Sequence, residues 1–233
     1  MIVGPIEGVI ISQEMRRARV PGILDIIGVG MLGPTIIAHG DDEQKTRYLG
    51  PMLHGDEVWC QLFSEPAAGS DLAAVQTRAK QNDDGTWTLN GQKVWTTNAQ
   101  FSSYGLVLAR TDPDQQKHRG MTMFVIPMDA EGVTVRGLRQ ISGEAEFNEV
   151  FFDDVVLPAE AVCGPVNGGW GTALTTLMFE RLTIGLGSES FGYRADRYAA
   201  PIGDHGAHVG AVTPIAKPGV RLEDQRSLFR YRQ

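Results

Sequence analysis

The sequence predicts an α+β protein of several domains, with a β-sheet domain between two helical segments. Apolar residues recur at helical spacing before about residue 58, about seven short segments with a two-residue period follow, and helical spacing then returns. A run of strands flanked by helices is typical of this class. Seven strands in roughly 110 residues favour a sandwich or a barrel.

Residues 1–58 are expected to form a partial N-terminal helical domain. Its first helix has apolar side chains three and four residues apart and ends at Pro21. A later helix begins with two aspartates, Asp41 and Asp42, that are able to cap it, and continues through good helix formers to the Gly-Pro pair at residues 50–51.

Residues 59–165 are expected to form the middle domain. Its strand-like segments are rich in β-branched and aromatic residues, and turn signals such as Asp84-Gly85 and Asn90-Gly91 separate them. The expected strands lie within residues 56–63, 86–91, 92–98, 104–111, 120–129, 133–138 and 146–157.

Helical spacing returns in residues 166–200, which are expected to begin a C-terminal helical domain. Residues 201–233 show no sustained period of either kind and are expected to be an atypical, disordered tail.

Composition excludes several classes of function. A formal net charge of −7 without clustered Lys or Arg argues against nucleic acid and anionic membrane surfaces. No segment approaches the roughly 20 apolar residues that span a bilayer. Cys60 and Cys163 give neither a disulfide framework nor a metal-binding spacing, so no metal site is expected. These features predict a soluble, cytoplasmic protein.

Three motifs suggest chemistry that their surroundings do not support. Residues 28–33 match the G-x-G-x-x-G pattern of a dinucleotide site, but no β-α-β alternation follows, so glycines between helices are the preferred interpretation. His205 and His208 lack further ligands at metal-binding spacing and are expected at the surface. Residues 185–192 do not complete a G-x-S-x-G nucleophile elbow.

The loop QLFSEPAAGSDL after the first expected strand is the strongest candidate for a binding site. Ser64, Gly69 and Ser70 offer hydroxyls and unhindered backbone N–H groups there. Further along, Trp95 and Thr97 lie on one face of a strand, where an indole can stack on a planar ring beside a hydroxyl. Taken singly, Trp95 is better interpreted as a core aromatic and Thr97 as a strand residue. Together these residues predict a site for a flat cofactor.

With their flanks, these segments resemble the acyl-CoA dehydrogenase family of flavoproteins. The resemblance extends from about residue 37 to residue 184, through HGDDEQKTRYLGPMLHGDE, CQLFSEPAAGSDLA, LNGQKVWTTNAQ, ISGEAEFNEVFFDDVVLP and NGGWGTALTTLMFER. It implies a helical N-terminal remnant, a middle antiparallel β-barrel and one helix of a C-terminal helical bundle. It also implies FAD-dependent α,β-desaturation of an acyl-CoA thioester to the trans-2-enoyl-CoA, with electrons passed to an electron-transfer flavoprotein.

The resemblance also assigns roles to residues. Phe63 and Ser64 would be the closest contacts to the flavin's pyrimidine edge, Trp95 would pack against the ring, and Thr97 would hydrogen-bond near N5. The implied cofactor-binding residues are Gln61, Phe63, Ser64, Gly69, Ser70, Trp95, Thr96 and Thr97. The implied substrate-binding residues are Ser70, Thr111, Met178 and Arg181.

Glu180 is the implied catalytic base, since some members of the family place this glutamate on the first helix after the barrel, before a common arginine. An α-proton of a thioester is too weakly acidic for water to remove, so a carboxylate must stand beside it. The competing interpretation is that Glu180 and Arg181 form only an ion pair on the helix.

Against the family pattern, the chain is expected to be truncated at both ends. The family has further N-terminal helices and a complete C-terminal bundle that builds a homo-oligomer, and an abrupt tail is what a shifted reading frame would produce. Without the bundle, Leu174, Leu177 and Leu182 are expected to be exposed. The alternative to an enzyme is therefore a catalytically incompetent remnant or a non-catalytic partner subunit.

Overall fold

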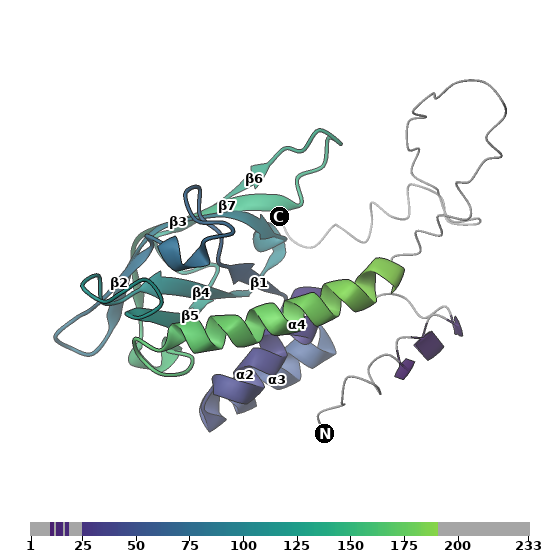
Figure 1. Ribbon diagram of the computed structural model, residues 1–233, viewed down its shortest axis with the longest axis horizontal. Coiled ribbons are helices and arrows are strands. Elements are labelled where there is room, and N and C mark those ends of the chain that lie inside the picture. The colour runs from purple at the N-terminus through teal and green to yellow at the C-terminus, as the bar shows by residue number, and fades with distance from the viewer. Residues whose placement is uncertain (1–9, 12, 16, 19–24, 191–233) are drawn as a thin grey trace. The chain divides into compact units, whose positions relative to one another are not determined.

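The computed structural model describes residues 10–11, 13–15, 17–18 and 25–190. In this part of the chain, helices precede and follow a curled β-sheet (Figure 1). The expected tail with His205 and His208, and most of the first expected helix, lie outside it. None of the described helices is both long and apolar enough to cross a membrane.

The helices before the sheet form one continuous layer. They are the π-helix η1 (Gly28–Leu32), α2 (Gly33–His39) and α3 (Asp42–His54). The Asp41 side chain caps α3 by accepting a hydrogen bond from the Gln44 backbone N–H at 2.7 Å, as predicted. The expected end at Pro51 is wrong. The helix includes this proline in its last turn and ends at Gly55, whose φ of 78° provides a left-handed C-cap.

Seven strands follow, although they are not the seven segments that the sequence suggested. The strands are β1 (Trp59–Leu62), β2 (Arg78–Gln81), β3 (Trp87–Thr97), β4 (Tyr104–Arg110), β5 (Met121–Pro127), β6 (Val133–Leu138) and β7 (Phe147–Leu157). The polar strand β2 was not predicted, and two predicted segments form the single strand β3. The turn expected at Asn90-Gly91 is therefore wrong. Gly91 allows close contact instead, since a Cβ there would lie 2.7 Å from the Thr77 Cα.

The sheet is a curled, mixed half-barrel. Its strand order is β1-β4-β2-β3-β7-β6, and β5 also pairs with β4. β1 and β2 pair with β4 in parallel, whereas the remaining pairs are antiparallel. The predicted β-domain between helices is confirmed, but its strands are not all antiparallel. β1 and β4 are not joined by a hairpin, since β2 and β3 lie between them in the chain, and this long connection allows the two strands to run parallel.

Two apolar cores lie on opposite faces of this sheet. Alternate residues of β4 serve both: Leu106 and Leu108 face the helices, while Val107 and Ala109 face the inside of the half-barrel. β5 alternates in the same way. Both strands are buried on their two faces, so their sequences are continuous apolar runs and not the alternating pattern that the sequence analysis expected.

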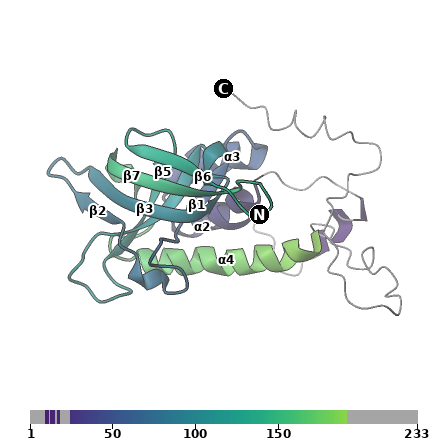
Figure 2. The same ribbon diagram turned by 90° about the horizontal axis from the view of Figure 1, so that it is seen from above.

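The long helix α4 (Gly169–Ser190) packs against η1, α2 and β5 (Figures 1 and 2). The glycines of η1 explain this contact. A Cβ at Gly30 would lie 2.9 Å from the Thr183 hydroxyl, so the G-x-G-x-x-G spelling reflects helix packing and not a nucleotide site. Leu174 and Leu182 are exposed as expected, but Leu177 packs against the helix-side core.

A buried ion pair joins four parts of the sheet domain. Lys93 of β3 is fully buried, and its Nζ donates to Glu65 at 2.8 Å, to the Phe63 carbonyl at 3.1 Å and to the Leu108 carbonyl at 2.8 Å. The Glu65 carboxylate also accepts the backbone N–H groups of Gln76 and Thr77. Every donor of the ammonium group is used, which is the condition under which a buried charge is tolerated.

Replacing Lys93 tests this network. Lys93→Met should lower the free energy of unfolding by about 3–5 kcal/mol, because it leaves the Glu65 carboxylate buried without a cation. Denaturant unfolding of the full chain measures the loss. Lys45→Met is the matched control, since Lys45 and Asp42 form an exposed pair at 3.7 Å and its removal should cost less than about 1 kcal/mol. Equal effects of the two substitutions would contradict the role given to Lys93.

Candidate functional site

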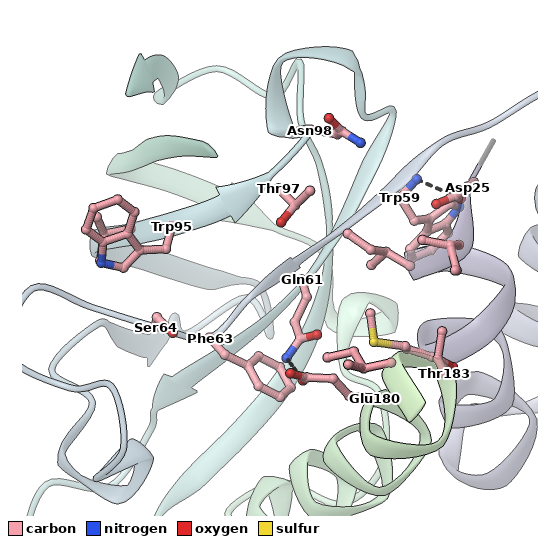
Figure 3. Close-up of a pocket in the computed structure, with 15 residues that line it drawn as sticks. Asp25, Trp59, Gln61, Phe63, Ser64, Trp95, Thr97, Asn98, Glu180 and Thr183 are labelled. Atoms are coloured by element: carbon pink, nitrogen blue, oxygen red, sulfur yellow. Dashed lines mark hydrogen bonds between the residues drawn. The ribbon is translucent and has the colours of Figure 1, made fainter. Parts of the chain in front are cut away.

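A cleft of about 470 Å³ lies between the sheet and the helices (Figure 3). The end of β1 and the loop after it form one wall, the end of β3 a second, and η1 with α4 a third. The lining residues are Asp25, Ile26, Ile27, Met31, Trp59, Gln61, Phe63, Ser64, Val94, Trp95, Thr97, Asn98, Glu180, Thr183 and Ile184. This volume is in the range of small-molecule sites.

A bulge in β3 exposes Trp95 at the cleft. The β3–β7 register shifts between Lys93 and Thr96, and Trp95 has a φ of 59°, which is strained for an aromatic residue. Instead of pairing with β7, the Val94 N–H donates to the Ser64 carbonyl at 2.9 Å. The Trp95 side chain is 61% exposed, and its ring meets Phe147 edge to face at 6.1 Å. One face of the indole is thus available for a ligand.

Several polar groups at the cleft have no partner within the described part of the chain. The Ser64 and Thr97 hydroxyls and the Asn98 side-chain amide line the cleft, and none of them makes a hydrogen bond to a described residue. Below them, Lys93 holds the Phe63 carbonyl and so fixes the loop that carries Ser64. Free donors and acceptors around an exposed aromatic ring suit a planar heteroaromatic ligand with polar edges.

Glu180 enters the cleft from α4, where three threonines fix the rotation of the helix. Thr176 bonds Thr35 at 3.0 Å, Thr175 bonds the His39 ring at 2.8 Å, and Thr183 donates to the Gly30 carbonyl at 3.0 Å. Glu180 lies four residues after Thr176 and three before Thr183, and therefore lies on the same side of the helix.

Among the described residues, one side chain donates a hydrogen bond to the Glu180 carboxylate. The Gln61 side-chain amide donates to Glu180 Oε2 at 3.1 Å (Figure 3). The alternative ion pair with Arg181 is not seen among the described residues, and adjacent positions on a helix do not face each other.

Asp25 is a second acid at the cleft, which the sequence analysis missed. The residue is 5% exposed, and its carboxylate accepts the Gly28 N–H at 2.8 Å and the Trp59 N–H at 3.0 Å. Burial raises its pKa to about 6, although these two hydrogen bonds oppose the rise. The only sequence signal was an aspartate three residues before a helical glycine, the spacing of an N-terminal cap.

The structure brings together some, but not all, of the residues that the resemblance assigned. Gln61, Phe63, Ser64, Trp95, Thr97 and Glu180 line the cleft. Thr96 points away into the interior of the sheet domain, where its hydroxyl is buried without a partner. Gly69 and Ser70 are exposed further along the loop, and Met178 and Arg181 are exposed on α4.

Thr111 belongs to a separate hollow. Its hydroxyl donates to the Asn167 side chain at 2.6 Å and bonds Thr122 at 2.8 Å. This hollow, of about 400 Å³, is also lined by Arg78, Lys80 and Arg110. No group of three metal-ligating side chains lies together in the described part of the chain.

Comparison with known families finds two matches in succession. The profile of the acyl-CoA dehydrogenase N-terminal domain matches residues 2–56, and that of the acyl-CoA dehydrogenase middle domain matches residues 60–155. The middle-domain match includes the β1 loop and the Trp95 bulge, whereas Glu180 lies beyond both matches.

Individual proteins agree with these matches. The chain is 47% identical over 184 residues to acyl-CoA dehydrogenase FadE34 of Mycobacterium tuberculosis, covering 79% of this chain and 26% of that one. A chain of the ChsE4-ChsE5 complex from M. tuberculosis is 31% identical to this chain, with a TM-score of 0.67. The match covers 76% of this chain and 45% of that one.

A glutaryl-CoA dehydrogenase from Mycobacterium smegmatis, solved in complex with FADH2, is 30% identical to this chain, with a TM-score of 0.62. The match covers 69% of this chain and 40% of that one. The chain thus spans less than half the length of each of these relatives.

The buried acid gives a prediction about pH. The pKa of Asp25 in the folded chain, about 6, exceeds its ordinary 3.8, so the folded state holds the proton more tightly. The stability that this proton contributes, about 3 kcal/mol, is present below pH 4 and is lost as the pH rises through 6. Unfolding measured at pH 4 and pH 7 should show this fall in the native chain but not in Asp25→Asn. Asp42→Asn, at an exposed carboxylate, should keep the native dependence, and a fall that survives in Asp25→Asn would refute the assignment.

Proposed function

The chain belongs to the acyl-CoA dehydrogenase family, and from this premise we propose that it desaturates an acyl-CoA thioester between its α and β carbons, with FAD as cofactor. The observation that carries the proposal is the cleft itself. The Glu180 carboxylate lines the same cleft as the Trp95 side chain and the unpaired hydroxyls of Ser64 and Thr97, so a thioester held between a flat cofactor and Glu180 would have its α-carbon beside a base.

The residues at the cleft fit a flavin. Trp95 would hold the cofactor by packing against its rings, while the Ser64 and Thr97 hydroxyls would bond its polar edge. When bound, FAD supplies the two-electron acceptor for the hydride that leaves the β-carbon. The family uses this cofactor, and one similar structure contains its reduced form.

Glu180 would act as the base. Its carboxylate takes the α-proton: the α-carbon–hydrogen bond breaks, an O–H bond forms on Glu180, and the electron pair stays on the α-carbon. When the β-hydride departs, that pair becomes the second bond of the trans-2-enoyl product. The substrate thus loses one proton and one hydride, which is a two-electron oxidation. We further propose an electron-transfer flavoprotein as the final acceptor of these electrons.

A second candidate is a non-catalytic partner subunit or an incompetent remnant. The α4 face with Leu174, Met178 and Leu182 is exposed to 44%, 68% and 40%, which is unusual for a helix that packs within a single domain. The chain also spans less than half of each of the relatives described above. If this alternative holds, another chain would either complete the cleft or carry the catalytic site itself.

The visible spectrum of the purified full chain distinguishes the two. Bound flavin that is bleached by a saturated acyl-CoA without oxygen supports the dehydrogenase, whereas a colourless protein supports the alternative. Glu180→Gln should keep the flavin but slow bleaching by about 10²–10⁴-fold, the usual contribution of a general base. Glu43→Gln, at an exposed glutamate on α3, should bleach at the native rate. Undiminished bleaching in Glu180→Gln would remove Glu180 from the mechanism.

A further inference from the structure

The contact between Gln61 and Glu180 joins two rigid elements. Gln61 lies on β1, where it pairs with Leu106 of β4, and its neighbours Cys60 and Leu62 are fully buried in the sheet core. Glu180 lies on α4, which the three threonine hydrogen bonds hold against η1 and α2. The backbones of both residues are therefore held in place, and the hydrogen bond between their side chains links the two elements at the cleft.

The chemistry of the two groups fixes the direction of the bond. A carboxylate accepts hydrogen bonds and does not donate them, so the Gln61 NH₂ must face Glu180 Oε2. No described residue donates to the other oxygen, Oε1. The amide of Gln61 is neutral, so it orients the carboxylate without adding charge. An arginine or a lysine in its place would put a positive charge beside the carboxylate.

We propose that Gln61 is a positioning residue for Glu180: its amide restrains rotation of the carboxylate through Oε2 and leaves Oε1 to accept the α-proton. This inference rests on the proposed dehydrogenase function. It differs from a role for Gln61 in contacting the flavin, because it makes the effect of Gln61 depend on Glu180. A carboxylate that rotates freely is in the reactive orientation for less of the time, so the proton-transfer rate should fall while substrate affinity is kept.

The chain contains a second glutamine–glutamate hydrogen bond that serves as a control for the substitutions. Gln92 donates to Glu149 Oε1 at 3.1 Å, the same donor, acceptor and length as in the Gln61–Glu180 pair, but away from the cleft. Methionine has nearly the length of glutamine and lacks its donor. Gln61→Met and Gln92→Met therefore remove equivalent hydrogen bonds at the candidate site and at a remote position.

The first measurement is made without flavin or substrate. In NMR spectra of the full chain, Glu180→Gln should shift the side-chain amide resonances of Gln61, which are assigned by their loss in Gln61→Met. Glu149→Gln should shift those of Gln92 and leave those of Gln61 in place. If the Gln61 resonances do not respond to Glu180→Gln, the two side chains are not bonded and the inference is overturned.

The second measurement follows exchange of the α-hydrogen of an acyl-CoA with deuterated water, in the full chain with FAD. Gln61→Met should slow exchange by about 10–100-fold with less than a threefold change in acyl-CoA affinity, and Gln92→Met should change neither. In the Glu180→Gln background, Gln61→Met should have no further effect, because its action passes through Glu180.

Native exchange in Gln61→Met, or equal slowing in both backgrounds, would overturn the positioning role. A native chain that exchanges no α-hydrogen would instead overturn the proposed function, and with it the proton-transfer part of the inference. In that case the amide resonances would still decide whether Gln61 holds Glu180.

Discussion

The buried pair of Lys93 and Glu65 is the constraint on which the candidate site depends. Together the ammonium and carboxylate groups join β3 and β4 to the residue after β1 and the residue before β2. Burial lowers the pKa of Lys93 to about 8, while Glu65 opposes the fall, and the same cation holds the pKa of Glu65 below its ordinary value against the effect of burial. Such a pair is tolerated only when complete, so it enforces one arrangement of these segments.

The geometry of the cleft follows from this arrangement. With Lys93 turned inward, the bulge after it sends Trp95 outward, and the Val94 amide is free to hold the loop at Ser64. The opposite wall is set independently by the fit of α4 against the glycines of η1. The wall formed by β1 meets the wall formed by η1 and α4 at the hydrogen bond between Gln61 and Glu180. The buried network around Lys93 and the close contact between α4 and η1 thus together determine where the Glu180 carboxylate lies.

Much of this fold could be predicted because local pattern and tertiary structure agree. Short segments rich in β-branched and aromatic residues identified β4 and β5, and helical spacing identified α4. Prediction failed where tertiary contact decided the outcome. Asn90-Gly91 has the composition of a turn, yet its glycine is needed because Thr77 packs against it. The parallel pairings of β1 and β2 join segments distant in sequence, which a two-residue period cannot show.

Part of the lining of the cleft could be predicted from the sequence, but its hydrogen bonds could not. Trp95 and Thr97 were found by their spacing on one strand, and Glu180 by its resemblance to a family motif. Asp25 was missed because an isolated aspartate carries no signal until its two backbone donors are known. The bond from Gln61 spans 119 positions of sequence and has no local signature.

The exposure of Trp95 has a practical consequence for following ligand binding. Of the four tryptophans, Trp59 and Trp87 are buried and Trp170 is partly buried, so Trp95 is the one whose ring stands largely in solvent beside the cleft. Its fluorescence emission will therefore lie at longer wavelength than that of the buried indoles. A ring system stacked on it would quench that component, which makes the red edge of the spectrum an intrinsic reporter of whether the cleft is filled.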